Sequence, residues 1–302
     1  ECLGHEEGRS LKLPPRREHL NKKMRYKEQE LQRLQDALYE TLGEVDRICR
    51  KHDIRYFVTG GTAIGAYFWQ KMLPWDDDID VGMMRSDYER FAEVAQQELG
   101  DRFFLQSPDT EPHTPFYFMK VRMNGSRFSE STFKHIDMHQ GIFVDIFPFD
   151  KVPRQKWLER LQHKVVFFLN GLFIAKEIWQ WKHCGRCDIP EPRKRGWLPC
   201  FFTRLLISLL GKRAIYKMMY GVQTIFNGRN LNEVKNIITR SEHLPIADIE
   251  QTQTVTLGPL QVCAARDLLL YLNNHYGSVR KDIPDEMKVS HRPEELVLPE
   301  HL

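Results

Sequence analysis

The stretch YFVTGGTAIGAYFWQKMLPWDDDIDVGM, residues 56–83, decides the fold of this chain. It opens in a run of β-branched and aromatic residues over 54–59, which predicts a buried strand that stops at Gly60 and Gly61. A short helix is expected to follow, beginning at Thr62. Because a helix N-terminus offers bare backbone N–H groups and the positive end of a dipole, Gly60, Gly61 and Thr62 are candidate phosphate-binding residues.

Four carboxylates lie within five residues near the end of this stretch, from Asp76 to Asp80. Like charges this close repel one another at neutral pH, and a cation would explain them. In an extended segment Asp78 and Asp80 point to one face while Ile79 packs behind them. Two hard oxygen donors on one face suit Mg²⁺ or Mn²⁺, so Asp78 and Asp80 are predicted metal ligands. Asp76 and Asp77 also fit an acidic surface turn.

A nearly all-apolar strand is expected over residues 141–150, GIFVDIFPFD, with Asp145 at its centre. An unpaired carboxylate is costly to bury. We therefore expect Asp145 to bind metal or to take a proton from a substrate hydroxyl, as a phosphoryl-type transfer requires. A structural Asp bonded to backbone amides is the alternative.

A hairpin that turns at Asn124 and Gly125 is predicted between these two motifs. Its register places Lys120 and Arg122 on one face, where they would balance the charge of a diphosphate. A solvated outer face is the alternative. His139 lies just before the Asp145 strand and is included as a neighbour of the site.

The three motifs together resemble the LicD family, and more distantly the fukutin-related glycan transferases. The resemblance is carried by residues 56–83, by KVRMNGSRF at 120–128 and by HQGIFVDIFPFD at 139–150. The preceding helix and IPDEMKVSH at 283–291 are similar to the family's flanking pattern. The resemblance therefore covers about residues 28–292.

The resemblance implies an α+β fold, a nucleotidyltransferase-type mixed β-sheet flanked by helices with a largely helical C-terminal part. It assigns Gly60 and Gly61 to the glycine pair, Asp78 and Asp80 to the metal ligands, and Asp145 to the third acid, which is also a metal ligand. Family members commonly transfer phosphocholine, or another phospho-alcohol, from a CDP-activated donor to a sugar hydroxyl of a cell-surface glycan.

An EC 2.7-class phosphotransferase is therefore implied, with Mg²⁺ or Mn²⁺ as cofactor and CMP as product. Its partners would be a CDP-linked donor and a glycan or lipid-linked oligosaccharide acceptor, in teichoic acid, lipopolysaccharide or capsule biosynthesis. Two alternatives stay open: an NTP-dependent nucleotidyltransferase that releases pyrophosphate, and a non-catalytic glycan-binding protein that keeps the fold.

Three parts are expected along the chain: a mobile basic arm over 1–22, a catalytic core over 23–150, and a mostly helical extension over 151–302 that packs on the core and recognises the acceptor. The core opens in a helix, because apolar residues recur at three- and four-residue steps from Leu31 to Cys49. In the extension, His183, Cys184, Cys187 and Cys200 raise the question of zinc, although one Cys-x-x-Cys is weak evidence.

Charge and hydropathy limit where the protein is expected to lie in the cell and what it is expected to bind. The 44 Lys and Arg against 41 Asp and Glu give a net charge of +3, which is too mild to indicate nucleic-acid binding. Six scattered cysteines and the lack of a signal-peptide pattern at the N-terminus favour a cytoplasmic protein. The apolar segment 197–210 is shorter than the ~20 residues of a membrane span. It is expected to be a buried helix or an interfacial one, which leaves open a peripheral contact of 196–220 with the inner face of a membrane.

Overall fold

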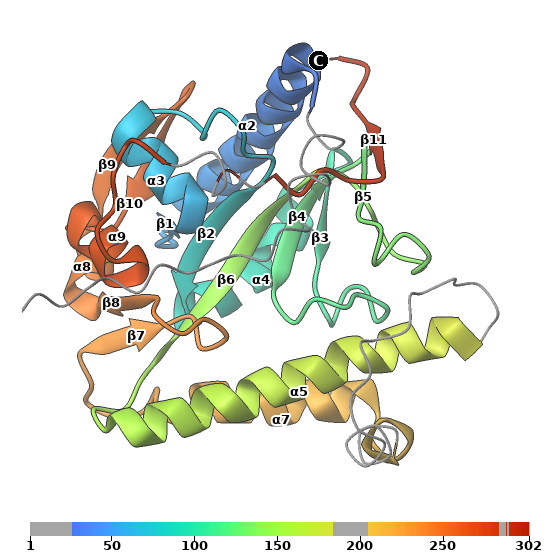
Figure 1. Ribbon diagram of the computed structural model, residues 1–302, viewed down its shortest axis with the longest axis vertical. Coiled ribbons are helices and arrows are strands. Elements are labelled where there is room, and N and C mark those ends of the chain that lie inside the picture. The colour runs from blue at the N-terminus through green and yellow to red at the C-terminus, as the bar shows by residue number, and fades with distance from the viewer. Residues whose placement is uncertain (1–25, 184–204, 284–287, 289, 302) are drawn as a thin grey trace, which may run out of the picture.

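The computed structural model describes residues 26–183, 205–283, 288 and 290–301. Its centre is a mixed seven-stranded sheet (Figure 1). The strands are β1 (Phe57–Val58), β2 (Ile79–Met84), β3 (Phe103–Gln106), β4 (Met119–Met123), β6 (Phe143–Lys151), β7 (Glu233–Lys235) and β8 (His243–Pro245). The order is β1-β2-β6-β4-β3, and β7 pairs with both β6 and β8. Only β2 and β6 run parallel among these pairs of described strands. The predicted α+β class, a mixed sheet flanked by helices, is confirmed.

Two helices, α2 (Glu28–Lys51) and α4 (Arg85–Glu98), pack against the sheet. The α2 helix forms where the apolar spacing predicted it, and Leu34, Leu42 and Ile48 on its inner stripe are fully buried. Alternate residues of β2 and β6, such as Val81 and Val144, are also fully buried and join the same apolar cluster. Because side chains alternate across a strand, the polar residues between them are presented on the opposite face of the sheet.

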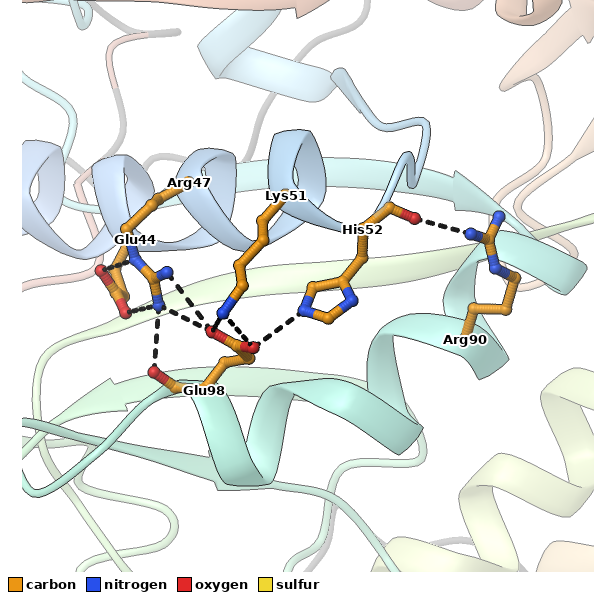
Figure 2. Close-up of polar contacts among 6 residues, drawn as sticks. All are labelled: Glu44, Arg47, Lys51, His52, Arg90 and Glu98. Carbon is orange, nitrogen blue, oxygen red and sulfur yellow. Dashed lines mark hydrogen bonds and ion pairs between the residues drawn. The ribbon is translucent and has the colours of Figure 1, made fainter.

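The outer faces of α2 and α4 are joined by ion pairs (Figure 2). Glu98, at the end of α4, accepts hydrogen bonds from Lys51 at 2.7 Å and from His52 at 2.9 Å, and Arg47 donates to its backbone oxygen at 3.0 Å. Hydrogen bonds from Lys51 and His52 lower the pKa of Glu98 to about 2. The pairs are exposed, so they orient the two helix ends more than they stabilise the fold.

The β1 edge of the sheet is covered by segments from both halves of the chain. They are α3 (Gly60–Trp69), α8 (Ile246–Glu250), the antiparallel pair β9 (Gln253–Leu257) and β10 (Leu260–Ala264), and α9 (Leu268–Tyr276). The α3 helix packs on β2, α9 and β9, and β10 packs on β1. Residues far apart in sequence, such as Gly60 and Tyr271 at a separation of 211 positions, thus build one side of the sheet.

A second layer is formed by two long helices, α5 (Lys156–His183) and α7 (Lys212–Thr224), which run along each other below the sheet in Figure 1. They bury their own apolar cluster around Val166, Phe173 and Ile215. An ion pair between Arg85 and Asp150, 2.6 Å long and almost fully buried, lies where this layer meets the sheet. Within the described ranges, no helix has the length and apolar character needed to cross a bilayer.

The predicted hairpin around Asn124 and Gly125 is wrong. The turn exists, with Gly125 at φ +71°, but the strand before it does not pair with the strand after it. Both edges of β4 are occupied, by β3 on one side and β6 on the other. The following strand, β5 (Arg127–Ser129), therefore pairs with β11 (Glu295–Val297) near the end of the chain.

Some predictions fall on residues outside the described ranges. The basic arm over 1–22 and the cysteines Cys184, Cys187 and Cys200 lie there, as does most of the apolar segment 197–210. The proposed division at residue 150 stays a prediction. In the described part of 151–302, helices supply most of the regular structure, and the short strands β7 to β11 accompany them.

Candidate functional site

Three charged residues from three strands lie side by side on one face of the sheet. In the register of the sheet, Asp80 of β2 pairs with Asp145 of β6, and Asp145 pairs with Lys120 of β4. The buried residues Ile79 and Val81 flank Asp80, so the strand turns the carboxylate away from the α2 and α4 side. The sheet therefore brings together Asp80, Lys120 and Asp145, of which the first and the last are 65 residues apart in sequence.

Asp145 and Lys120 form a buried ion pair. Lys120 Nζ lies 2.6 Å from Asp145 Oδ1 and 3.5 Å from the centre of the Phe143 ring, so an aromatic face also stabilises the ammonium group. Burial raises the pKa of Asp145 to about 6, against the opposing effect of Lys120. Burial also lowers the pKa of Lys120, although Asp145 opposes the shift. The pair supplies a carboxylate whose pKa is close to neutral, which suits a general base.

Further carboxylates crowd Asp80. Burial and the charges of Asp78 and Asp145 raise the pKa of Asp80 well above its usual value. Burial and the charges of Asp78 and Asp77 do the same for Asp76. Without a cation, protonation is the only relief for such mutual repulsion, so this cluster of acids favours a bound cation.

The glycine pair lies directly against this cluster. Gly60 begins α3 at φ +57°, and a Cβ placed on it would lie 2.9 Å from Asp80 Oδ2. A Cβ on Gly61 would lie 2.8 Å from Asp76 Oδ2. The hydroxyl of Thr62 accepts a hydrogen bond from the backbone N–H of Asp80 at 2.9 Å. All three predicted residues thus lie against the acidic run, and a side chain at either glycine would displace a carboxylate.

The amide of Gly60 has an internal partner. Its N–H donates to the Tyr271 hydroxyl at 3.0 Å, and this hydroxyl donates to Glu242 at 2.8 Å. The predicted phosphate contact at Gly60 would therefore compete with Tyr271. The role of Thr62 in substrate binding stays a prediction, because its hydroxyl is engaged by Asp80.

Two other predicted residues are held by partners outside the acidic cluster. Arg122 is 1% exposed, and its guanidinium donates to Gln106 and to the backbone oxygen of Gly141, both at 2.7 Å. His139 stacks on Phe104 and contacts Asn124 at 2.8 Å. Burial, with the charge of Arg122, lowers the pKa of His139 to about 4, so its ring is neutral at physiological pH. These contacts give both residues structural partners in this conformation.

Several residues of the site were missed or misread from the sequence. Asp77, for which the sequence left an acidic surface turn open, is 1% exposed and accepts hydrogen bonds from Tyr26 at 2.7 Å and from the backbone N–H of His291 at 2.9 Å. Asp76 is buried as well. The acidic run itself was the signal for both. Nothing local in the sequence marks Glu242, because only the fold brings it near Asp80.

The clustered carboxylates of the acidic run offer oxygen ligands, which suit a hard divalent cation. Among the described residues, ligand atoms of Asp77, Asp78 and His291 lie within 4.8 Å of one another. Asp78, Asp80 and Asp145 do not form such a group within this part of the chain, and Asp145 is paired with Lys120. The predicted ligation by Asp78, Asp80 and Asp145 stays a prediction.

Residues 53–170 match the protein-family model described as LicD/FKTN/FKRP, nucleotidyltransferase domain. Residues 53–170 are thus similar to the nucleotidyltransferase domain of the LicD family. The matched range contains the glycine pair, the acidic run, Lys120 and Asp145, which are the residues that the sheet gathers.

Three curated proteins are similar to this chain over part of their lengths. The lipopolysaccharide cholinephosphotransferase LicD of Haemophilus influenzae is 29% identical over 140 residues, 44% of this chain and 48% of that protein. An uncharacterized protein of Rickettsia typhi is 34% identical over 68 residues, 22% of each chain. An uncharacterized protein of Rickettsia prowazekii is 31% identical over 61 residues, 20% of this chain and 23% of that protein. The chain thus spans about half or less of the relatives it matches.

Proposed function

We propose that this chain transfers phosphocholine, or a related phospho-alcohol, from a CDP-activated donor to a sugar hydroxyl of a cell-surface glycan, with Mg²⁺ or Mn²⁺ and with release of CMP. The observation that carries the proposal is the register of the sheet, which places Asp80 beside Asp145 and Asp145 beside Lys120. The name of the Haemophilus influenzae relative, a lipopolysaccharide cholinephosphotransferase, supports the transferred group and the class of acceptor.

Each acidic residue has a role in this proposal. Asp78 and Asp80 would hold the divalent cation, which when bound neutralises the charge of the donor's diphosphate. Asp145 would accept the proton of the sugar hydroxyl. The hydroxyl oxygen would then bond to the phosphorus that carries the alcohol, while the bond from this phosphorus to CMP breaks. The pKa of Asp145, near 6, leaves most of it ionised at neutral pH and ready to take that proton.

Lys120 would act through Asp145. Its ammonium group holds the carboxylate at 2.6 Å and orients it toward the acidic cluster. A direct contact of Lys120 with the diphosphate, as predicted from the sequence, would require this ion pair to open. Arg122, bound to Gln106 and Gly141, would support the strand rather than the donor.

The proposal is tested by metal-dependent release of CMP from CDP-choline. We expect Asp78→Asn and Asp80→Asn each to reduce turnover at least about 100-fold, because each removes a charge that would hold the cation at the donor's diphosphate. Asp137→Asn is the control, since Asp137 is exposed and lies outside the cluster. Full turnover in both cluster variants, with the fold intact by circular dichroism, would overturn the assignment.

The same assay separates the alternatives. Release of pyrophosphate from an NTP, with no CMP from any CDP-linked alcohol, would establish a nucleotidyltransferase. Absence of both products, together with calorimetric binding of glycan and no binding of Mg²⁺ or Mn²⁺, would establish a non-catalytic glycan-binding protein. Parallel reactions with CDP-choline, CDP-ribitol, CDP-glycerol and CDP-ethanolamine would identify the transferred group.

A further inference from the structure

A cavity of about 630 Å³ lies between the first half of α5 and the β7–β8 region. Its volume falls in the range of small-molecule sites. Half of its ten lining residues are cationic: Lys156, Arg160, Lys164, Lys235 and Arg240. Glu159 is the one carboxylate among the ten. The cavity therefore has a strong excess of positive charge.

The carboxylate of Glu159 is already neutralised within the cavity. It lies 3.0 Å from Lys235 Nζ, 3.3 Å from Lys156 Nζ and 2.9 Å from His243 Nε2. Burial alone would raise the pKa of Glu159, but the hydrogen bond from Lys235 and the neighbouring charges outweigh burial and lower it. Glu159 thus pairs with Lys156, Lys235 and His243 and leaves three outer cations of the cavity without a carboxylate partner among the described residues.

The outer cations are Arg160, Lys164 and Arg240, all exposed side chains. No carboxylate of the described chain forms an ion pair with any of the three. Deeper in the cavity, Lys235 is 2% exposed and bonds Glu159 and the backbone oxygen of Arg240, which uses two of its three N–H donors. His243 Nδ1 is shielded from solvent and has no hydrogen bond within the described residues.

The cavity is next to the acidic cluster but separate from it. No residue of the cluster lines it. His243, which lines the cavity, directly follows Glu242, whose charge acts on Asp80. Because successive side chains of an extended segment point to opposite sides, this edge of the sheet separates an acidic site from a basic one.

We propose that this cavity binds a phosphate or diphosphate group, independently of the acidic cluster. Two guanidinium forks and an ammonium group around one concave surface match the several oxygens of a phosphate, to which arginine binds in a bidentate manner. The buried Lys235, which has one N–H donor left, supplies a further donor at the base. The phosphate would belong to a soluble phosphorylated molecule or to a lipid. If it belongs to a lipid, the exposed apolar residues of α5, Trp157, Leu161 and Phe167, would face the lipid.

Calorimetry with pyrophosphate, on the full chain in EDTA, tests the soluble source. We expect Arg160→Gln and Arg240→Gln each to weaken binding about fivefold, the loss of one exposed charged contact. Lys217→Gln, which removes an equal charge from the exposed face of α7, should leave the affinity unchanged. Asp80→Asn should change it by less than about twofold, because the acidic cluster takes no part, and this keeps the result independent of the transferase assay.

Sedimentation with vesicles tests the lipid source. Phosphatidylcholine vesicles that contain phosphatidic acid, a phosphate monoester, are compared with vesicles of equal charge that contain phosphatidylserine. Binding that needs phosphatidic acid and is weakened by Arg160→Gln and Arg240→Gln, but not by Lys217→Gln, assigns the phosphate to a lipid. No binding in either assay, or an equal loss with Lys217→Gln, overturns the proposal.

Discussion

Gly60 and Gly100 have nearly the same backbone conformation, at φ +57° and +58°, in very different surroundings. A Cβ on Gly100 would meet nothing within 4 Å, whereas a Cβ on Gly60 would lie 2.9 Å from Asp80 Oδ2. Gly100→Ala therefore measures the backbone strain alone, which should cost about 1 kcal/mol. Gly60→Ala should lower the free energy of unfolding in urea by at least about 1 kcal/mol more than Gly100→Ala does. It should also weaken Mg²⁺ binding, because the new side chain displaces Asp80. Equal effects of the two substitutions would show that Asp80 can move freely.

Glu242 makes the stability of the metal-free protein depend on pH. Burial raises its pKa to about 7, against the hydrogen bonds from Tyr271 and its neighbours. The folded state then binds this proton more tightly than the unfolded state does, so stability falls as pH rises from about 4.5 to about 7. Glu242→Gln should therefore be more stable than the natural chain at pH 8, on the order of 2 kcal/mol, and no more stable at pH 5.

Thermal or urea unfolding at the two pH values checks this expectation. Glu250→Gln serves as the control, because Glu250 is an exposed residue at the end of α8. If the free energies of unfolding of the natural chain and Glu242→Gln change in parallel from pH 5 to 8, ionisation of Glu242 does not destabilise the folded state.

At the scale of elements, a buried ion pair between α4 and β6 also contacts the α5–α7 layer. Asp150 of β6 lies 2.6 Å from Arg85 at the start of α4, and Gln223 of α7 accepts a weaker bond from the same guanidinium at 3.3 Å. Asp150→Ala leaves a buried arginine without its partner and should destabilise the fold by about 3–5 kcal/mol.

An exposed pair of the same length is the matched comparison. Arg127 and Glu295 also lie 2.6 Å apart, on β5 and β11, with about half of each side chain exposed. Glu295→Ala should cost no more than about 1 kcal/mol, because solvent already screens the pair. Chemical denaturation of both variants measures the difference, and similar losses would mean that burial of Asp150 is not what makes its pair strong.

For the whole molecule, the end of the chain closes over the start of the acidic run. Its backbone N–H at His291 donates to the buried Asp77, and β11 supplies the partner strand of β5. Removal of residues 290–302 should therefore destabilise the fold by at least about 1–3 kcal/mol, the cost of a buried acceptor that loses a donor. Calorimetric titration should show weaker Mg²⁺ binding as well, because Asp77 and Asp78 lose their neighbour.

His291→Ala separates the backbone from the side chain. The substitution keeps the N–H that bonds Asp77 and removes an imidazole that is 68% exposed, so it should cost less than about 1 kcal/mol. If the truncated chain and His291→Ala unfold at the same urea concentration, the tail contributes only through the imidazole.

The sequence by itself determined the elements around the site and the residue types within it. Apolar spacing predicted α2, the all-apolar run predicted β6 with Asp145 at its centre, and the run at 76–80 marked the acids. These features are local, because they depend on the period of a helix or strand and on charges a few residues apart. The resemblance to the LicD family rested on the same segments, which the matched range 53–170 contains.

Only the tertiary structure decided which residues face one another. Pairing of β4 with both β3 and β6, instead of with β5, turned Lys120 into the partner of Asp145 and enclosed Arg122. Closure by the last third of the chain buried Asp77 and brought Glu242 and Tyr271 to the glycine pair. Strand pairing and chain closure depend on contacts between residues far apart in sequence, and a local pattern carries no information about which edge of a strand is free.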